Sequence, residues 1–159
     1  MIRLLVVVVS FGMALAFAGC GGGSAACGTT TCNALCGSVQ QTYKLDFERV
    51  ECLRMDQGGQ PNAYIVQYVD KVGNMPVKIV VNAPVKQGED KDLVATGSTI
   101  KHTMPSASEF PEMKEGKIIF DGLGDIGGSC DGRFYVTFVK TGSTLDGGFC
   151  ATMKLLSAP

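Results

Sequence analysis

The stretch Cys130-Asp131-Gly132-Arg133-Phe134-Tyr135-Val136-Thr137-Phe138 is followed, 15 residues further on, by Leu145-Asp146-Gly147-Gly148-Phe149-Cys150-Ala151-Thr152-Met153. The two stretches carry the same residue, Asp, Gly, Phe or Thr, at four matching positions. A repeat of this length is too short for a solenoid unit and suits two consecutive β-strands. The sequence therefore predicts a β-hairpin over residues 130–153.

We expect a two-residue turn at Thr141-Gly142, which places Phe138 opposite Leu145. In this register Phe134 faces Phe149, and the large apolar side chains share one face of the hairpin. The opposite face then carries polar side chains and one aromatic: Arg133, Tyr135, Thr137 and Asp146. One apolar and one polar face predict an antiparallel pair that covers a core on one side.

The rest of the chain from Lys44 onward shows short alternating runs separated by Gly, Pro, Asn and Asp. This pattern is typical of strands. We expect a bulged strand over 45–52, and further strands at 64–69, 77–81, 94–104 and 117–120, with a short helical turn between Pro111 and Gly116. Residues 44–159 are thus predicted to form a single all-β domain, an antiparallel β-sandwich or partly open barrel of seven or eight strands.

The start of the chain predicts export. Arg3 precedes an almost wholly apolar run from Leu4 to Ala18, which ends at Gly19-Cys20. This pattern is typical of a signal peptide, here residues 1–19. The run is shorter than the roughly 20 residues that a membrane span needs.

The four residues Phe17-Ala18-Gly19-Cys20 resemble the lipobox of bacterial lipoproteins. The resemblance covers residues 1–20 only. It implies that Cys20 receives a diacylglyceryl group, becomes the new N-terminus and binds the membrane through this lipid. Because Gly21 is not acidic, the sorting pattern of that family implies the outer membrane of the bacterial cell envelope. Ala16-Phe17-Ala18 also forms an A-x-A cleavage site, so a secreted or periplasmic protein is the alternative.

The cysteine count favours lipidation and predicts disulfides. The chain has seven cysteines, an odd number for an oxidising compartment, and lipidation of Cys20 leaves six. The disulfide candidates are Cys27, Cys32, Cys36, Cys52, Cys130 and Cys150. In the predicted register Cys130 and Cys150 point to opposite faces and cannot be bridged. At least one of them should pair with an N-terminal cysteine, closing a loop of roughly 80 to 120 residues.

Residues 20–43 contain no charged side chain and are rich in small polar residues, which is a linker composition. We expect a lipid-anchored tether whose later part is attached to the folded domain by disulfides of its cysteines. Without residues 1–19 the chain has 13 basic and 15 acidic residues. A net charge of −2 argues against nucleic acid as a partner.

Motifs that would carry chemistry are few. His102 is the only histidine and shares strand parity with Ile100 and Met104, so we expect a partly buried strand residue. A blue-copper site normally needs a second histidine. Gly124-Asp125-Ile126-Gly127-Gly128 has isoleucine where a trypsin-like protease has its serine, and we expect a glycine-rich turn. The aspartates of 121–131 lack the EF-hand spacing. We assign no catalytic residue, no metal ligand and no cofactor.

A possible ligand surface remains on one predicted strand, where Tyr64, Gln67 and Tyr68 could present aromatic rings beside an amide. The sequence predicts a lipid-anchored envelope protein that acts as a binding or structural module for an unidentified protein or ligand. The alternative is an envelope hydrolase whose carboxylate- or serine-based site forms only on folding. A pocket lined by two converging ionisable groups would favour the hydrolase.

Overall fold

The computed structural model describes residues 32–156, and this part of the chain is all-β. Eight strands follow one another in a curled, open sheet with the order β5-β7-β8-β9-β2-β3-β4-β6, and a ninth strand, β1, pairs with β9. The result is a half-barrel, which confirms the predicted all-β fold and partly open barrel.

The elements are short and closely spaced along the chain. In order they are β1 (Ala34–Cys36), the 3-10 helix η1 (Ser38–Gln41), β2 (Arg49–Gln57), β3 (Gln60–Val69), β4 (Met75–Asn82), β5 (Asp90–Asp92), β6 (Thr99–Thr103), β7 (Met113–Leu123), β8 (Ser129–Phe138) and β9 (Thr144–Leu155).

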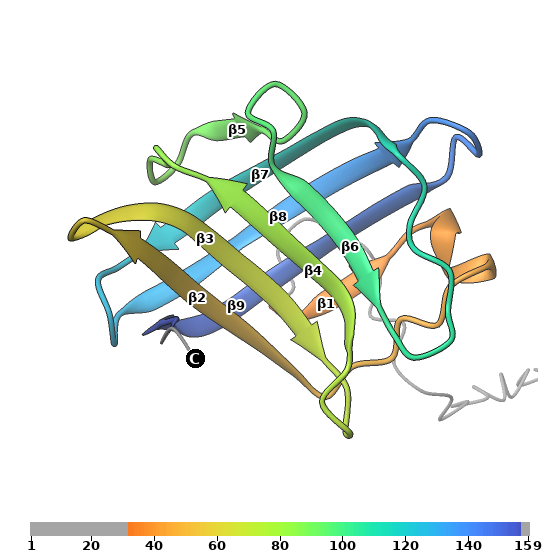
Figure 1. The fold of residues 1–159 in the computed structure, drawn as a ribbon, viewed down its shortest axis with the longest axis horizontal. Coiled ribbons are helices and arrows are strands. Elements are labelled where there is room, and N and C mark those ends of the chain that lie inside the picture. The colour runs from red at the N-terminus through yellow and green to blue at the C-terminus, as the bar shows by residue number, and fades with distance from the viewer. Residues whose placement is uncertain (1–31, 157–159) are drawn as a thin grey trace, which may run out of the picture.

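The sheet curls into two layers that meet at β9. Strands β2, β3, β4 and β6 cross over β7, β8 and β9, with the core between them (Figure 1). The layers join where β2 pairs with the end of β9, from Cys52 opposite Met153 to Arg54 opposite Leu155. This pairing is parallel, whereas the prediction was an antiparallel sheet throughout. The sheet is therefore mixed.

The core is filled by large side chains from both layers. Tyr68, Phe120, Phe138 and Phe149 are fully buried. The Tyr68 hydroxyl of β3 donates a hydrogen bond of 2.7 Å to the carbonyl oxygen of Gly148 on β9. This bond satisfies the polar end of a buried ring, because an unpaired buried hydroxyl is costly.

The hairpin forms at the predicted strands, but its register differs by two residues. Val136 pairs with Leu145, and Phe134 pairs with Gly147 instead of Phe149. The physical reason is the connection, which has four residues and not two: the Phe138 amide donates to the carbonyl of Ser143, at 3.0 Å. Because a shift of two preserves parity, the predicted apolar face is still the buried one.

The observed register places a glycine opposite each aromatic ring of the repeat. Gly132 pairs with Phe149, and Gly147 pairs with Phe134. A Cβ on Gly132 would lie 2.7 Å from the Phe149 ring, and one on Gly147 would lie 2.7 Å from the Phe134 ring. The repeated Asp-Gly-x-Phe pattern therefore encodes two reciprocal glycine–aromatic pairs.

Three local predictions are wrong. The first strand begins at Arg49, and its irregularity lies between Met55 and Asp56 instead of near residue 48. Residues 94–97 form a turn before β6, and Val94 is exposed. No helical turn starts at Pro111: β7 begins at Met113 and runs through Gly116, where a Cβ would come within 3.2 Å of both Leu93 and Val136.

The later part of the predicted tether is folded. β1 pairs with residues 146–148 of β9, and Leu35 and Val39 are buried in the core. Residues 32–43 of the predicted tether thus pack onto the domain, as expected for its disulfide-bonded later part, and the folded unit begins ahead of the predicted boundary at residue 44.

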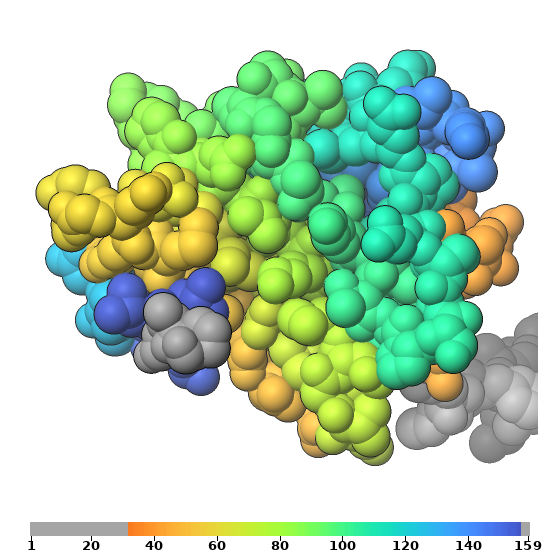
Figure 2. Space-filling model, in the orientation of Figure 1, coloured from red at the N-terminus to blue at the C-terminus, as the bar shows by residue number. Residues whose placement is uncertain are grey.

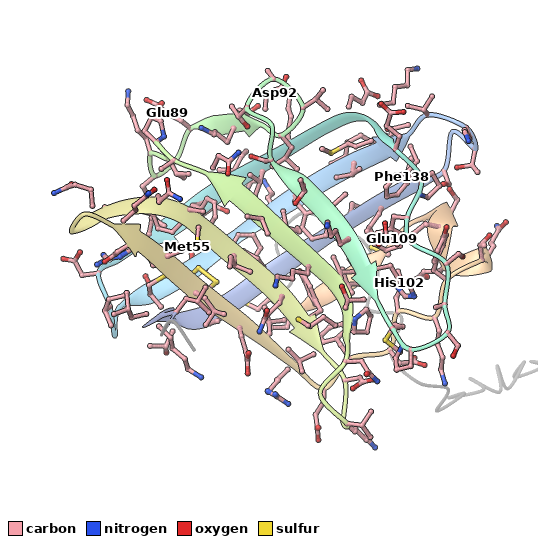
Figure 3. The ribbon with its side chains drawn as sticks, in the orientation of Figure 1. Met55, Glu89, Asp92, His102, Glu109 and Phe138 are labelled. Atoms are coloured by element: carbon pink, nitrogen blue, oxygen red, sulfur yellow. A yellow bond between two sulfur atoms is a disulfide. The ribbon has the colours of Figure 1, made fainter. Side chains whose placement is uncertain are left out.

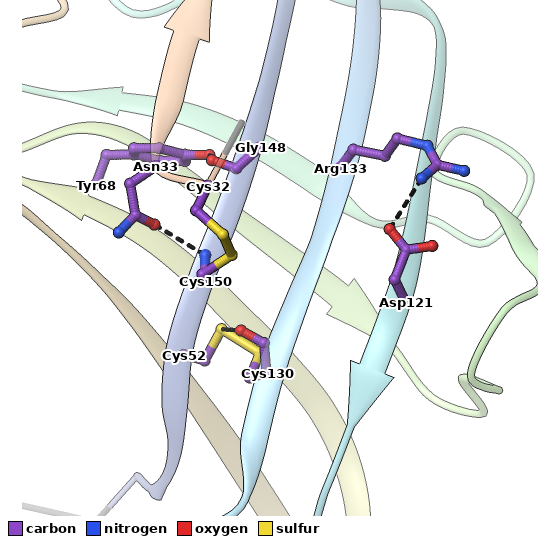
Figure 4. Close-up of a disulfide and its surroundings, with 9 residues drawn as sticks. All are labelled: Cys32, Asn33, Cys52, Tyr68, Asp121, Cys130, Arg133, Gly148 and Cys150. Atoms are coloured by element: carbon purple, nitrogen blue, oxygen red, sulfur yellow. Dashed lines mark hydrogen bonds and ion pairs between the residues drawn. A yellow bond between two sulfur atoms is a disulfide. The ribbon is translucent and has the colours of Figure 1, made fainter. Parts of the chain in front are cut away.

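Two disulfides join distant parts of the chain. Cys32 bonds to Cys150, a separation of 118 residues, and Cys52 bonds to Cys130, a separation of 78 (Figure 4). Cys130 and Cys150 lie on opposite faces and do not pair with each other, as predicted. Cys36 is also disulfide-bonded, whereas Cys20 and Cys27 lie outside the described residues.

Truncation of the hairpin's inner face should be much more costly than truncation of its outer face. Phe134→Ala should lower the free energy of unfolding by about 3 to 5 kcal/mol, because a fully enclosed ring is replaced by a cavity. Tyr135→Ala, at a side chain that is 45% exposed, should cost clearly less. Urea denaturation measures both, and equal losses would contradict the assignment of the faces.

The two disulfides should differ in their access to reductant. Cys32 is exposed and Cys150 is half-buried, whereas Cys52 and Cys130 are each 1% exposed. Thiol–disulfide exchange requires access to a sulfur atom. Brief reduction of the native protein, followed by alkylation and peptide mass mapping, should label Cys32 and Cys150 before Cys52 and Cys130. Earlier labelling of Cys52 and Cys130 would contradict the burial described here.

Candidate functional site

The predicted ligand surface on β3 is not a surface. Tyr68 is fully buried and Tyr64 is 9% exposed, because both point into the core. Gln67 has the opposite parity and points outward, where its amide donates to Glu51 at 2.7 Å. The two tyrosine rings instead pack against Phe134 and Phe120 of the other layer. Burial raises the pKa of Tyr68 far above the ordinary tyrosine value.

His102 is a buried residue of β6, as its strand parity predicted. Its Nδ1 lies 2.7 Å from the carbonyl oxygen of Pro76, and its ring packs against Tyr43 and Phe110. The Tyr43 hydroxyl in turn donates to the carbonyl of Glu109 in the loop between β6 and β7. Figure 3 shows His102 and Glu109 together at this end of the molecule. The cluster therefore holds the loop against the core.

The aspartate-rich segment 121–131 contains a turn, and two of its carboxylates form ion pairs with arginine side chains. Residues 124–128 form the predicted glycine-rich turn, closed by a bond from the Gly128 amide to the Asp125 carbonyl. Asp121 is paired with Arg133, at 2.9 Å (Figure 4). The Asp125 carboxylate, which is fully exposed, lies 3.5 Å from Arg54. Within residues 32–156, no three His, Cys, Asp or Glu side chains are grouped so that they could hold a metal ion.

An open depression lies where β3 begins and β4 ends. It encloses about 460 Å³ and is lined by Gln60, Pro61, Asn62, Tyr64, Ala83, Pro84 and Val85. Its volume would suit a small ligand. Among its lining residues the phenol of Tyr64 is the only ionisable group, so the depression lacks the pair of converging groups that acid–base hydrolysis requires.

The more distinctive feature is the outer face of β2, β3, β4 and β6, which we call the outer β2–β4 face. Leu53 pairs with Ile65, and Ile65 pairs with Val80, so the three side chains form one row across three strands. All three have the parity opposite to the core residues Cys52, Val66 and Ile79. Met55 lies on the same face, one row further along β2 (Figure 3).

No described element packs over this apolar row. Figure 2 looks onto this side of the molecule, where atoms of β3, β4 and β6 form much of the visible surface. Leu53 and Val80 are partly exposed, whereas Ile65 between them is only 5% exposed. Sequence reasoning missed this row, although the unbroken apolar run Tyr64-Ile65-Val66 indicates apolar side chains on both faces of β3.

Charged side chains border the apolar row. Glu51 accepts hydrogen bonds from Arg49 at 2.8 Å and from Gln67 at 2.7 Å, and these bonds lower its pKa. Lys78 pairs with Lys101 across β4 and β6, and Lys154 pairs with Leu53 at the other end of the row. The face thus combines a central apolar row with a mainly basic border.

Comparisons with known proteins do not assign a function. No family model matches the sequence, and neither the curated proteins nor the solved structures give a match. In residues 32–156 we also find no helix that could span a bilayer. The site must therefore be judged on its own chemistry.

The Glu51 cluster should make stability depend on pH. Because the folded state lowers the pKa of Glu51, the ionised carboxylate stabilises the fold above the ordinary glutamate pKa of about 4.3. This contribution is lost as the pH falls through the lowered value. Glu51→Gln should cost about 1 kcal/mol at pH 7. Urea denaturation from pH 7 to pH 3 should show the difference shrinking, and a constant difference would contradict the assignment.

Proposed function

We propose that this chain is a lipid-anchored protein of the bacterial cell envelope that acts as a binding or structural module. The observation that carries the proposal is the outer β2–β4 face, over which no element of residues 32–156 packs and which combines an apolar row with a charged border. Uncovered apolar side chains with a polar border are typical of interaction surfaces.

The anchor is proposed on the lipobox-like residues Phe17-Ala18-Gly19-Cys20. The Cys32–Cys150 disulfide fixes the chain to β9 only 12 residues after Cys20. Twelve residues span at most about 40 Å when fully extended, and about 20 Å on average as a flexible linker. The tether is thus half as long as the sequence alone predicts, and it would keep the domain close to the membrane.

The hydrolase alternative has less support. It needs ionisable groups that converge in a pocket. Tyr64 is the only ionisable residue that lines the depression beside β3, and Arg54 forms ion pairs with Asp56 at 2.8 Å and Asp125 at 3.5 Å outside it. No observation in the described part of the chain favours hydrolysis over binding.

Replacement of the lipidated cysteine tests the anchor. In a bacterial host, the wild-type protein should fractionate with membranes, and the Cys20→Ser protein should be soluble, because it has no acyl chain to bury. Each buried methylene contributes about 0.8 kcal/mol, so two or more chains hold a protein firmly. Ser24→Ala is the control, since it changes a residue outside the lipobox and leaves every cysteine in place. A Cys20→Ser protein that stays in the membrane with residues 1–19 attached would contradict the proposal.

A further inference from the structure

The two outer faces of the half-barrel carry opposite charge. The outer β2–β4 face, together with the end of β9 that pairs with β2, has four basic side chains and one carboxylate: Arg49, Lys78, Lys101, Lys154 and Glu51. That carboxylate is already hydrogen-bonded to Arg49 and Gln67. The border loops carry both signs in pairs, such as Lys44 with Asp46 and Lys86 with Glu89.

The outer face of the other layer, made by β5, β7, β8 and β9, is acidic. Its carboxylates are Asp90, Asp92, Glu115, Asp121, Asp131 and Asp146. Its cations are Lys114, at a bulge of β7, and Lys117 and Arg133, which pair with Asp90 and Asp121. A chain with almost no net charge therefore has a strong internal separation of charge between its two faces.

We propose that the outer β2–β4 face rests on a membrane surface that carries anionic phospholipid. Basic side chains near such a surface each contribute about fivefold in affinity. The acidic face of the other layer is repelled by the same surface, so only one orientation of the domain is favoured. The inference extends the proposed function, because the short tether from Cys20 would hold the domain where this weak attraction is effective.

The apolar row suits the interfacial region better than a deep insertion. Leu53 and Val80 are only partly exposed, so they can contact lipid without entering the hydrocarbon layer. The lysine side chains beside them can lay their methylene stems along this row while their ammonium groups reach lipid phosphates. Charge supplies most of the attraction, and the apolar row adds close contact.

A second copy of the chain is a less suitable partner for this face than a membrane, even though the acidic face of that copy has complementary charge. Four strands about 4.8 Å apart and five to ten residues long give a surface of only about 500 Å². A stable protein interface buries about 800 Å² on each partner. A membrane surface needs no such minimum, because a lipid anchor would supply the local concentration.

Vesicle binding by the unacylated chain tests this inference separately from the anchor. The full-length Cys20→Ser protein, exported and purified, is sedimented with phosphatidylglycerol or phosphatidylcholine vesicles at low and high salt. We expect binding to the anionic vesicles only, and its loss as salt rises. Because no acyl chain is present, the result does not depend on whether Cys20 is lipidated in the wild type.

Two triple variants with the same change in net charge distinguish the face from the charge as a whole. Lys78→Gln, Lys101→Gln and Lys154→Gln together should weaken binding about 100-fold, at roughly fivefold for each lysine. Lys114→Gln, Lys117→Gln and Lys140→Gln, which lie in β7 and in the β8–β9 connection, away from the face, should leave it nearly unchanged. Circular dichroism checks that both variants are folded.

Three outcomes would overturn the inference. The first is no binding of the Cys20→Ser protein to phosphatidylglycerol vesicles at low salt. The second is an equal loss in the two triple variants, which would show that overall charge and not this face is responsible. The third is lipid-independent self-association that the first triple variant abolishes, which would assign the face to a second copy of the chain. Membrane release of Cys20→Ser in cells together with vesicle binding in vitro would support both proposals.

Discussion

The structure depends on a bend in the sheet at β9, and the Cys52–Cys130 disulfide holds this bend closed. Cys52 of β2 and Cys130 of β8 lie on the two sides of β9, opposite Met153 and Ala151. In a flat sheet, strands on the two sides of a third are about 9 to 10 Å apart. The two Cα atoms are 6.3 Å apart, and both side chains are buried in the core. The sheet must therefore fold sharply at this point.

The bend separates two surfaces with different chemistry. One curled sheet buries a single face, so its other face remains outside on both layers. The layer of β2, β3, β4 and β6 exposes the apolar row and the lysines, and the layer of β5, β7, β8 and β9 exposes carboxylates. The Cys32–Cys150 disulfide fastens the N-terminal arm to β9, where the layers meet. We propose that the charges of the two faces decide which one meets an anionic membrane surface.

Local patterns in the sequence predict the strands well and the long-range contacts poorly. The faces of the hairpin and the burial of His102 follow from strand parity, which needs no knowledge of the fold. A two-residue turn predicts the wrong hairpin register, because the connection has four residues. The two glycines of the repeat, Gly132 and Gly147, are the local signal for the correct register, since each lies opposite an aromatic ring. The parallel β2–β9 contact and the basic outer face could not be predicted, since each joins segments that are far apart in the sequence. The prediction that Tyr64 and Tyr68 form a ligand surface is wrong, because β3 is apolar on both faces and its sequence does not show which face is buried.

The claim that the Cys52–Cys130 disulfide closes the two layers is tested most directly by amide hydrogen exchange on Cys52→Ala/Cys130→Ala, with Cys32→Ala/Cys150→Ala as the matched control. Protection reports local opening strand by strand. The account predicts that the first variant loses protection mainly where β2 pairs with residues 153–155 of β9, while the β7–β8 pairing stays protected. The control should lose protection near β1 instead. An unchanged β2–β9 junction in the first variant, or the same loss in both variants, would contradict the account.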